Sequence, residues 1–288
     1  MGARPVSTPF PTATEIALEL PSGVTLCGED AGAGPAVVLL HGLSATRRHV
    51  VQGSNYLLRH GYRLVAYDAR GHGCSGPAPE PKAYQYSDLS ADLDAVLEHL
   101  GLERFVLAGS SMGAATAMAF ALRDPGRVQA MVQITPAYGG APRTDGIDKD
   151  RIWIQLADAL ADGPESFADE ALPHAMPEQW RETAKKATIQ RMEAHRDLEA
   201  VANAMRVVPW SRAFDGMEQV TTLDIPTLVV GSRDEADSLH PLEVAEAYAE
   251  RMPNAELIVE DKDTSPLAWQ GAQLSRAIEG FLRRNGVE

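Results

Sequence analysis

A serine between two glycines is the residue pattern in this chain with the clearest capacity for chemistry. Residues 109–113 read Gly-Ser-Ser-Met-Gly, so Ser111 lies at the centre of a G-x-S-x-G motif. The apolar run Phe105–Ala108 precedes the motif, and the helix formers of 114–122 follow it. A serine at a sharp turn from a strand to a helix can present its hydroxyl as a nucleophile, and small flanking residues tolerate the strained backbone of such a turn. Ser111 is therefore the candidate nucleophile.

The composition is that of an acidic globular chain. Its 288 residues are 44% hydrophobic and 23% charged, which suits one elaborated α/β domain or two small domains. The net charge of −14 disfavours nucleic acid and anionic membranes as partners. No apolar run approaches the length of a membrane span, and the N-terminal stretch lacks the apolar segment of a secretion signal. We expect a small-molecule substrate and a cytoplasmic location.

The two cysteines, Cys27 and Cys74, lie far apart in the sequence. Their spacing fits no metal or redox motif, so we expect reduced thiols, in keeping with a cytoplasmic setting.

Alternating strand and helix patterns predict the fold class. Residues 15–29 predict an opening antiparallel hairpin. Buried strands are predicted at 36–40, 62–67, 105–108, 128–134, 227–230 and 257–259. Helices are predicted at 48–60, 86–100, 111–123, 241–252 and 267–284. This order predicts an α/β fold with a mostly parallel central sheet and helices on both faces.

One long interruption divides the pattern. Residues 137–222 separate two predicted core strands and carry helical patterns together with three of the four tryptophans. An insert after the carboxyl end of a strand lies over the edge of the sheet where ligands bind. We expect a helical cap at 137–222 within the same domain as a core formed by 1–136 and 223–288.

Four motifs occur in one order along the chain, each after its own predicted strand. They are His41-Gly42-Leu43, the loop from Asp68 to Gly76 (Asp-Ala-Arg-Gly-His-Gly-Cys-Ser-Gly), the Ser111 motif, and Gly231-Ser232-Arg233-Asp234. Together they resemble the α/β-hydrolase superfamily over nearly the whole chain. The G-x-S-x-G motif alone would be a weak signal, whereas four landmarks in register are a strong one.

The resemblance implies a role for each motif. Ser111 would be the nucleophile, and Asp234 the carboxylate that orients a base, with the nearby Asp237 as an alternative. The backbone N–H groups of Leu43 and Met112 would stabilise the oxyanion, a contribution of about 3–4 kcal/mol for one strong donor. The family resemblance implies neither a cofactor nor a metal.

The glycines at 71, 73 and 76 also match a dinucleotide-binding fingerprint. Prolines at 77, 79 and 81 follow them instead of a helix. Because a pyrophosphate site needs the N-terminus of a helix, we expect no nicotinamide cofactor.

The chain departs from the family pattern at the base. Relatives carry a histidine in the loop after the last strand, but here Thr264 stands at that position and no histidine follows His240. A threonine hydroxyl cannot act as a base near neutral pH. In the serine protease subtilisin, losing the base costs about a millionfold in turnover, although about 10³–10⁴-fold catalysis over water survives.

Three explanations for Thr264 remain open. His240 could supply the base, since it follows Asp234 at the same edge of the sheet, although a His-Pro pair also opens this helix in relatives that keep the usual base. The protein could instead do non-hydrolytic work, or the histidine could have been removed by design. A desolvated Asp263 beside Ser111 could also accept a proton.

The leading expectation is an enzyme that acts on a small, partly apolar ester, thioester or lactone through Ser111. The alternatives are a cyclase or lyase that uses the pocket without an acyl-enzyme, and an inactive ligand-binding protein or inactivated variant. Labelling of Ser111 by an organophosphonate would separate the first hypothesis from the others.

Overall fold

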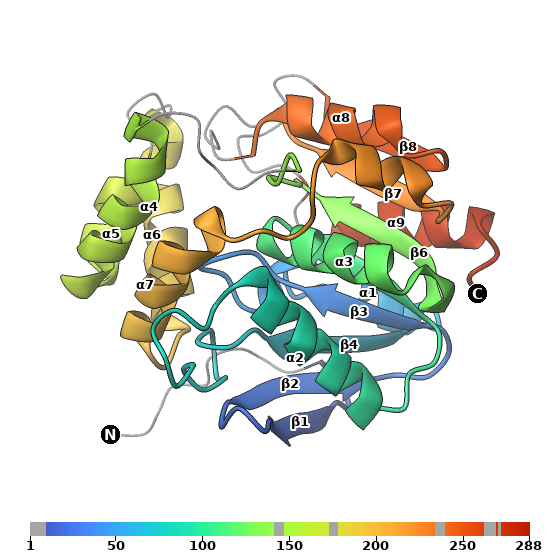
Figure 1. Cartoon of the computed structure of the whole chain (residues 1–288), viewed down its shortest axis with the longest axis horizontal. Helices are drawn as coiled ribbons and strands as arrows, with labels where there is room; N and C mark the ends of the chain where they lie inside the picture. Colours follow the sequence, from blue (N-terminus) through green and yellow to red (C-terminus); the bar gives the residue numbers. More distant parts are fainter. Residues whose placement is uncertain (1–9, 141–146, 173–177, 234–239, 262–268, 270–271) are drawn as a thin grey trace.

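The structure is a computed structural model that describes residues 10–140, 147–172, 178–233, 240–261, 269 and 272–288 (Figure 1). Its centre is an eight-stranded sheet in the order β1-β2-β4-β3-β5-β6-β7-β8. The strands are β1 (Thr14–Glu19), β2 (Thr25–Ala31), β3 (Ala36–Leu40), β4 (Arg63–Asp68), β5 (Phe105–Ser110), β6 (Val128–Ile134), β7 (Thr227–Gly231) and β8 (Ala255–Val259). β1, β2 and β4 pair antiparallel, and the pairs from β4 to β8 are parallel. The predicted fold class is therefore confirmed.

Helices cover both faces of the sheet (Figure 1). One face carries α2 (Tyr86–His99), α3 (Met112–Arg123) and α8 (Leu242–Arg251), and the other carries α1 (Tyr56–Arg59) and α9 (Ala272–Arg284). The continuous apolar runs of β3, β5 and β7 are buried because they contribute side chains to both of these cores. This packing fixes the carboxyl ends of the parallel strands, which carry the loops of the candidate site.

The segment predicted as a helix over 48–60 is mostly irregular. It forms a 3-10 helix at Arg47–His49 and the single turn α1. Gln52 and Gly53 between them have φ angles of 49° and 68°. A right-handed helix cannot pass through this left-handed backbone, so the continuous helix expected there is wrong.

The described part of residues 137–222, between β6 and β7, contains four α-helices. They are α4 (Ile147–Ala161), α5 (Pro164–Ala171), α6 (Glu178–Glu193) and α7 (Leu198–Val207), and 3-10 helices at Val208–Trp210 and Met217–Thr222 follow them. Figure 1 shows α4–α7 as a group beside the sheet. Their apolar side chains, including those of Leu160, Phe167 and Met205, form a separate buried cluster against which Leu43 packs. The helical insert thus meets the core at the loop after β3.

A disulfide joins Cys27 of β2 to Cys74, and their Cα atoms are 5.8 Å apart, within the usual range for a disulfide. The sheet register places Cys27 opposite Asp68, and the loop that follows Asp68 returns to β2, where the Gly76 N–H donates to the Thr25 carbonyl at 2.8 Å. The expectation of two reduced thiols is therefore wrong for this structure. Sequence spacing missed the pair because strand register brings the two residues together.

No helix in the described ranges combines the length and the apolarity needed to cross a lipid bilayer.

Candidate active site

Ser111 occupies a strained turn between β5 and α3. Its backbone has φ 50° and ψ −109°, a conformation that costs a non-glycine residue about 1–3 kcal/mol. The Ser111 N–H donates to the carbonyl of Ile134 at 3.0 Å, and the Ser111 carbonyl accepts the N–H of Ala115 at 3.1 Å. These two bonds tie the strained residue to β6 on one side and to the first turn of α3 on the other.

Close backbone contacts explain the glycines around this serine. A Cβ at Gly109 would overlap the carbonyl oxygen of Gly113, and a Cβ at Gly113 would overlap the carbonyl oxygen of Leu40. A Cβ at Gly42 would lie 3.3 Å from the Cβ of Ser111. The loop after β3 therefore lies directly against the serine, where only small residues fit.

His240 lies next to the serine hydroxyl. Its Nε2 is 2.7 Å from the Oγ of Ser111, within hydrogen-bond distance. The ring is half-buried and immediately precedes Pro241, the N-cap of α8, so the start of a rigid helix holds it in place. With the ring proton on Nδ1, Nε2 accepts the hydroxyl proton of Ser111. The sequence identified His240 as a possible substitute base, and the structure brings it to the serine.

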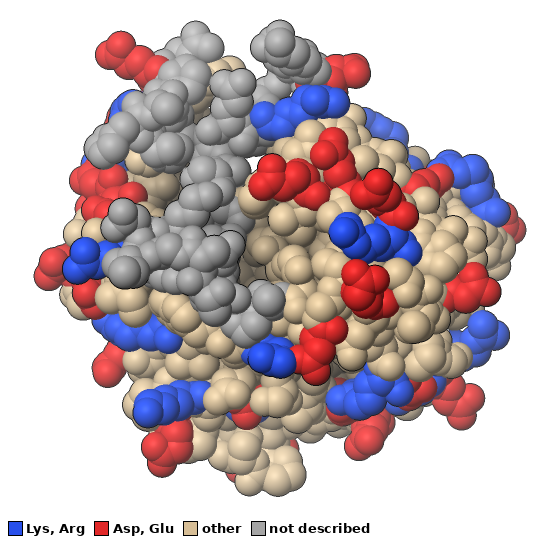
Figure 2. Space-filling view, turned by 45° about the horizontal axis from the view of Figure 1, so that its top comes forward, with Lys and Arg blue, Asp and Glu red and all other residues tan. Residues whose placement is uncertain are grey.

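Four residues that the sequence singled out share one cavity. Leu43, Ser111, Met112 and His240 line a space of about 480 Å³, part of which opens to solvent. Its other lining residues are Tyr86, Ala137, Tyr138, Trp153, Val208 and Pro209. Figure 2 shows a hollow near the centre of this face of the molecule. Several acidic side chains lie on the surface above the hollow and to its right.

Two backbone N–H groups are available at this cavity. Met112 is the first residue of α3, so its N–H has no acceptor within the helix. Leu43 lies in a tight turn, in which the Ala45 N–H donates to the Gly42 carbonyl at 3.1 Å and Ser44 has φ 61°. Both residues fit the oxyanion donors implied by the family resemblance.

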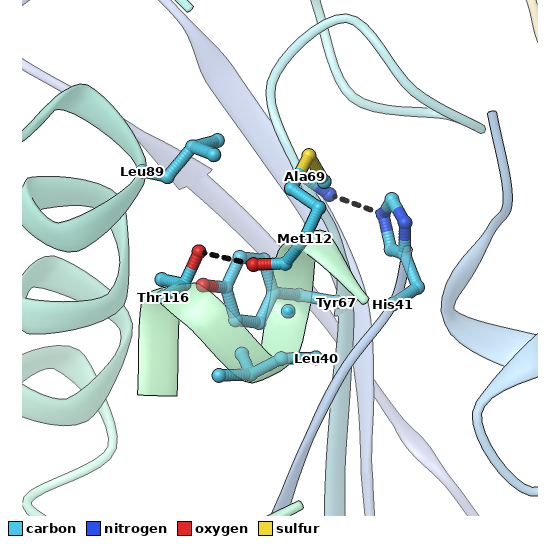
Figure 3. Close-up of a pocket in the computed structure, with 8 residues that line it drawn as sticks. Leu40, His41, Tyr67, Ala69, Leu89, Met112 and Thr116 are labelled. Atoms are coloured by element: carbon cyan, nitrogen blue, oxygen red, sulfur yellow. Dashed lines mark hydrogen bonds between the residues drawn. The ribbon is translucent and has the colours of Figure 1, made fainter. Parts of the chain in front are cut away.

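His41 is a buried structural residue rather than a second base. Its Nε2 accepts the N–H of Ala69 at 2.8 Å, which leaves the ring proton on Nδ1 to donate to the Gly42 carbonyl at 2.8 Å. Burial lowers the pKa of His41 to about 4, so the ring is neutral at neutral pH. Figure 3 shows the first of these bonds. His41 thereby links the loop after β3 to the loop after β4.

His72 makes a similar connection. Its Nε2 accepts the N–H of Ser44 at 3.4 Å, and its Nδ1–H donates to the Arg70 carbonyl at 3.0 Å. Burial is the main cause that lowers the pKa of His72 to about 3. The neutral ring therefore holds Ser44, the residue that follows Leu43.

His195 extends these links to the helical insert. Its Nδ1 accepts the N–H of Gly73 at 2.8 Å, so its Nε2–H donates to the Ser44 carbonyl at 3.3 Å. Burial holds its pKa well below the usual value. We refer to His41, His72 and His195 as the histidine cluster, in which successive ring centroids are 5.1 and 5.6 Å apart. Sequence reasoning missed His195, because no local pattern marks a contact across 151 residues.

Asp68 is a buried carboxylate with several partners. It accepts the backbone N–H of Arg47 at 2.7 Å and of Cys74 at 3.0 Å, and it forms an ion pair with the Arg47 guanidinium. Its ligand atoms and those of Cys27 and Cys74 lie within 4.8 Å of one another. Since the sulfurs are joined to each other and the carboxylate is ion-paired, this group crosslinks two loops in this structure rather than offering open metal ligands.

A second cavity lies beneath Met112 (Figure 3). It is a narrow, partly open space of about 240 Å³ and is lined by Leu40, His41, Tyr67, Ala69, Leu89, Met112, Gly113 and Thr116. The Thr116 hydroxyl donates to the Met112 carbonyl at 2.9 Å. Met112 borders both this cavity and the one that holds Ser111.

Asp234 and Thr264 lie outside the described residues, as do the alternatives Asp237 and Asp263. The described residues just before Asp234 are held by Glu260, a carboxylate that is only 7% exposed at the end of β8. It accepts the Ser232 hydroxyl at 3.0 Å and the Arg233 N–H. Sequence reasoning missed Glu260. The only sign of it in the sequence is its position directly after an apolar strand.

Comparisons with known proteins agree with this architecture. The sequence model of the alpha/beta hydrolase fold family matches residues 35–264. The AB hydrolase superfamily protein YisY of Bacillus subtilis is 28% identical over 243 residues, which are 82% of this chain and 86% of that protein. Curated relatives of 34–38% identity match over shorter stretches, which cover 31–43% of their own length.

Two solved structures illustrate the likeness in fold. A thermophilic esterase from Thermogutta terrifontis superposes with a TM-score of 0.74 at 24% identity and covers 96% of this chain and 99% of its own. The enol-lactonase from Burkholderia xenovorans LB400 superposes with a TM-score of 0.71 at 21% identity, covering 91% of this chain and 97% of its own. At such identities the likeness shows a shared fold.

Proposed function

Because the chain belongs to the alpha/beta hydrolase fold family, we propose that it hydrolyses a small, partly apolar ester, thioester or lactone with Ser111 as the nucleophile. The observation that carries this proposal is the distance of 2.7 Å between His240 Nε2 and Ser111 Oγ. A nucleophile and a base within hydrogen-bond reach are the pair that acyl transfer requires. His240 would thus supply the base that is missing at Thr264.

In the first half of the reaction, His240 takes the proton of Ser111 as Oγ attacks the substrate carbonyl. The carbonyl oxygen becomes an oxyanion and accepts the backbone N–H groups of Leu43 and Met112. The protonated His240 then donates its proton to the leaving alcohol, thiol or ring oxygen as the acyl–heteroatom bond breaks. An acyl-enzyme on Ser111 remains.

In the second half, water attacks the acyl-enzyme while His240 accepts one of its protons. The same two N–H groups stabilise the second oxyanion, and His240 returns the proton to Ser111 as the acid leaves. Asp234 would orient the protonated ring, the role implied by its position after β7. These steps use groups of this chain and water.

The proposed substrate follows from the wall of the cavity. Tyr86, Tyr138 and Trp153 line it together with aliphatic residues, which favours an apolar or aromatic part in the substrate. The solved relatives described as an esterase and an enol-lactonase support the choice of ester and lactone bonds. We also propose that residues 137–222 act as a cap on the core of 1–136 and 223–288.

A fluorophosphonate probe tests this proposal directly. We expect the probe to label wild-type protein at Ser111, with mass spectrometry identifying the modified peptide. Ser111→Ala should abolish labelling, while the matched control Ser110→Ala should retain it. A wild-type protein that stays unlabelled at high probe concentration would contradict an activated serine and favour non-hydrolytic work.

A further inference from the structure

Trp153 of α4 carries a hydrogen-bond donor that lacks an acceptor. Its Nε1 is buried and has no hydrogen-bond partner among the described residues. The same side chain lines the cavity that holds Ser111 and His240. A buried N–H without an acceptor costs free energy, because in the unfolded chain water satisfies it. A donor retained in the wall of a cavity is therefore a candidate contact for whatever fills that cavity.

Most of the rest of the cavity wall is apolar or already engaged in hydrogen bonds within the protein. Leu43, Met112, Ala137, Val208 and Pro209 contribute aliphatic surface. The hydroxyl of Tyr138 donates to the Phe214 carbonyl at 2.9 Å, so it is used within the protein. The lining residues described for this cavity include no Lys, Arg, Asp or Glu. The wall thus offers apolar contacts to most of a ligand and an indole donor to one of its atoms.

The helical insert holds this donor in place. Trp153 packs against a buried cluster to which Leu156, Ala157 and Leu160 of the same helix contribute. α4 packs against α7, which contributes Val201 and Met205 to the cluster. Because neighbouring turns of α4 are anchored in this way, the indole has a restricted range of orientations, and little conformational entropy is lost when it donates to a ligand.

We propose that Trp153 determines substrate specificity by donating its Nε1–H to a neutral oxygen acceptor in the acyl part of the substrate, such as a ketone or ether. An indole N–H can only donate, which excludes a ligand hydroxyl acting as the donor. A carboxylate is disfavoured, because burying an anion needs a compensating cation that the described wall lacks. This inference rests on the proposed ester hydrolysis and narrows its substrate class.

Matched methyl esters test the proposal, since methanol as leaving group adds no further acceptor. One pair is methyl 4-oxo-4-phenylbutanoate and methyl 4-phenylbutanoate, and the other is methyl phenoxyacetate and methyl 3-phenylpropanoate. The acid released is titrated at constant pH, and the ratio of kcat/KM within each pair is the readout. Differences in intrinsic ester reactivity cancel when this ratio is compared between protein variants.

We expect the wild-type ratio to favour the acceptor-bearing ester of at least one pair by about 5- to 100-fold relative to the variants. Trp153→Phe removes the N–H and should lower the ratio by this factor relative to the wild type. Replacing Trp153 by 3-benzothienylalanine substitutes sulfur for the N–H at nearly constant size and should have the same effect, even if the phenylalanine variant folds poorly.

Trp180→Phe is the matched control, because Trp180 lies on α6 and is 38% exposed. It should keep the wild-type ratios. Ratios that are the same in the wild type and the benzothienylalanine variant, while the esters are still hydrolysed, would overturn the role of Trp153 and leave the proposed function intact. Failure of the wild type to hydrolyse any ester or to be labelled at Ser111 would overturn the proposed function itself.

Discussion

The histidine cluster and His240 are two regions built from the same residue type with different outcomes. His41, His72 and His195 are 1–7% exposed, and both ring nitrogens of each bond to backbone groups, at least one of which belongs to a neighbouring loop. His240 is half-buried, and its Nε2 meets a side-chain hydroxyl. The backbone partners fix the tautomer of each cluster ring, whereas a hydroxyl can exchange its proton with the ring.

The difference teaches that the partners of the two ring nitrogens decide what a histidine does. A ring that accepts one N–H and donates to one carbonyl is a crosslink, and protonation would break the bond at its accepting nitrogen. A ring that faces an ionisable or reacting group can gain and lose a proton without a loss of structure. The cluster therefore maintains the loop after β3, whereas the contact of His240 with Ser111 supports its proposed role as the base.

The sharpest test of this comparison is His240→Gln. We expect kcat/KM for an ester to fall by about 10⁴-fold or more, because the nucleophile loses its proposed base. The melting temperature should change little, since the ring is only half-buried. His60→Gln, at an exposed position, is the control and should keep its activity. A loss smaller than tenfold would show that another group accepts the proton of Ser111.

The second largest effect should come from acid, which we expect to lower the free energy of unfolding through the histidine cluster. The folded-state pKa values of His41 and His72 are lowered to about 4 and about 3 from the ordinary 6.5. The unfolded chain therefore binds more protons below pH 6.5, so the free energy of unfolding falls as pH drops from about 6.5 to about 4. His41 alone would account for a loss on the order of 3 kcal/mol over this window.

Urea denaturation at a series of pH values measures this loss. His72→Gln should flatten the curve between pH 6.5 and 4, because one proton difference between the folded and unfolded states disappears. His99→Gln, at an exposed position, should leave the shape of the curve unchanged. A free energy of unfolding that stays constant across the window would contradict the neutral, buried state of the cluster.

The disulfide should have an effect of similar or smaller size. It closes a loop across a separation of 47 residues and tethers the segment that carries His72. For a crosslink that closes a loop of this length, the chain-entropy account gives about 4 kcal/mol of stability, and disulfides typically contribute about 2–4 kcal/mol. Cys27→Ser and Cys74→Ser should each lower the free energy of unfolding by this amount in urea. Two titratable thiols in the unreduced wild type, together with unchanged stability in the variants, would show that no disulfide forms.

Thr264→His in a His240→Gln background should have the smallest effect. We expect it to restore about tenfold of the lost activity, since the family resemblance implies a base at this position. The ester assay of the double variant measures the gain, and Thr264→Gln in the same background is the control. A folded double variant that remains as slow as His240→Gln would show that the loop at 264 no longer reaches the serine.

The sequence predicted the frame of the site well because its signals are local. β3, β5 and β7 appear as continuous apolar runs, and the glycines at 109 and 113 mark close backbone contacts. What it missed depends on contacts between distant segments. His195 reaches Ser44 across 151 residues, and Cys27 reaches Cys74 through strand register. The prediction of a helix over 48–60 was wrong because it relied on the apolar pattern of the segment and did not take account of the left-handed backbone at Gly53.

Met112 has a consequence for how this protein could acquire new substrates. It lines both the space of about 480 Å³ around the serine and the partly open space of about 240 Å³ beneath it, and in the proposed mechanism its backbone N–H stabilises the oxyanion. A shorter side chain at this position could join the two volumes and leave the N–H donor in place. The length of the acyl chain that fits would then depend on the side chain at position 112, so a single substitution there could widen the range of substrates.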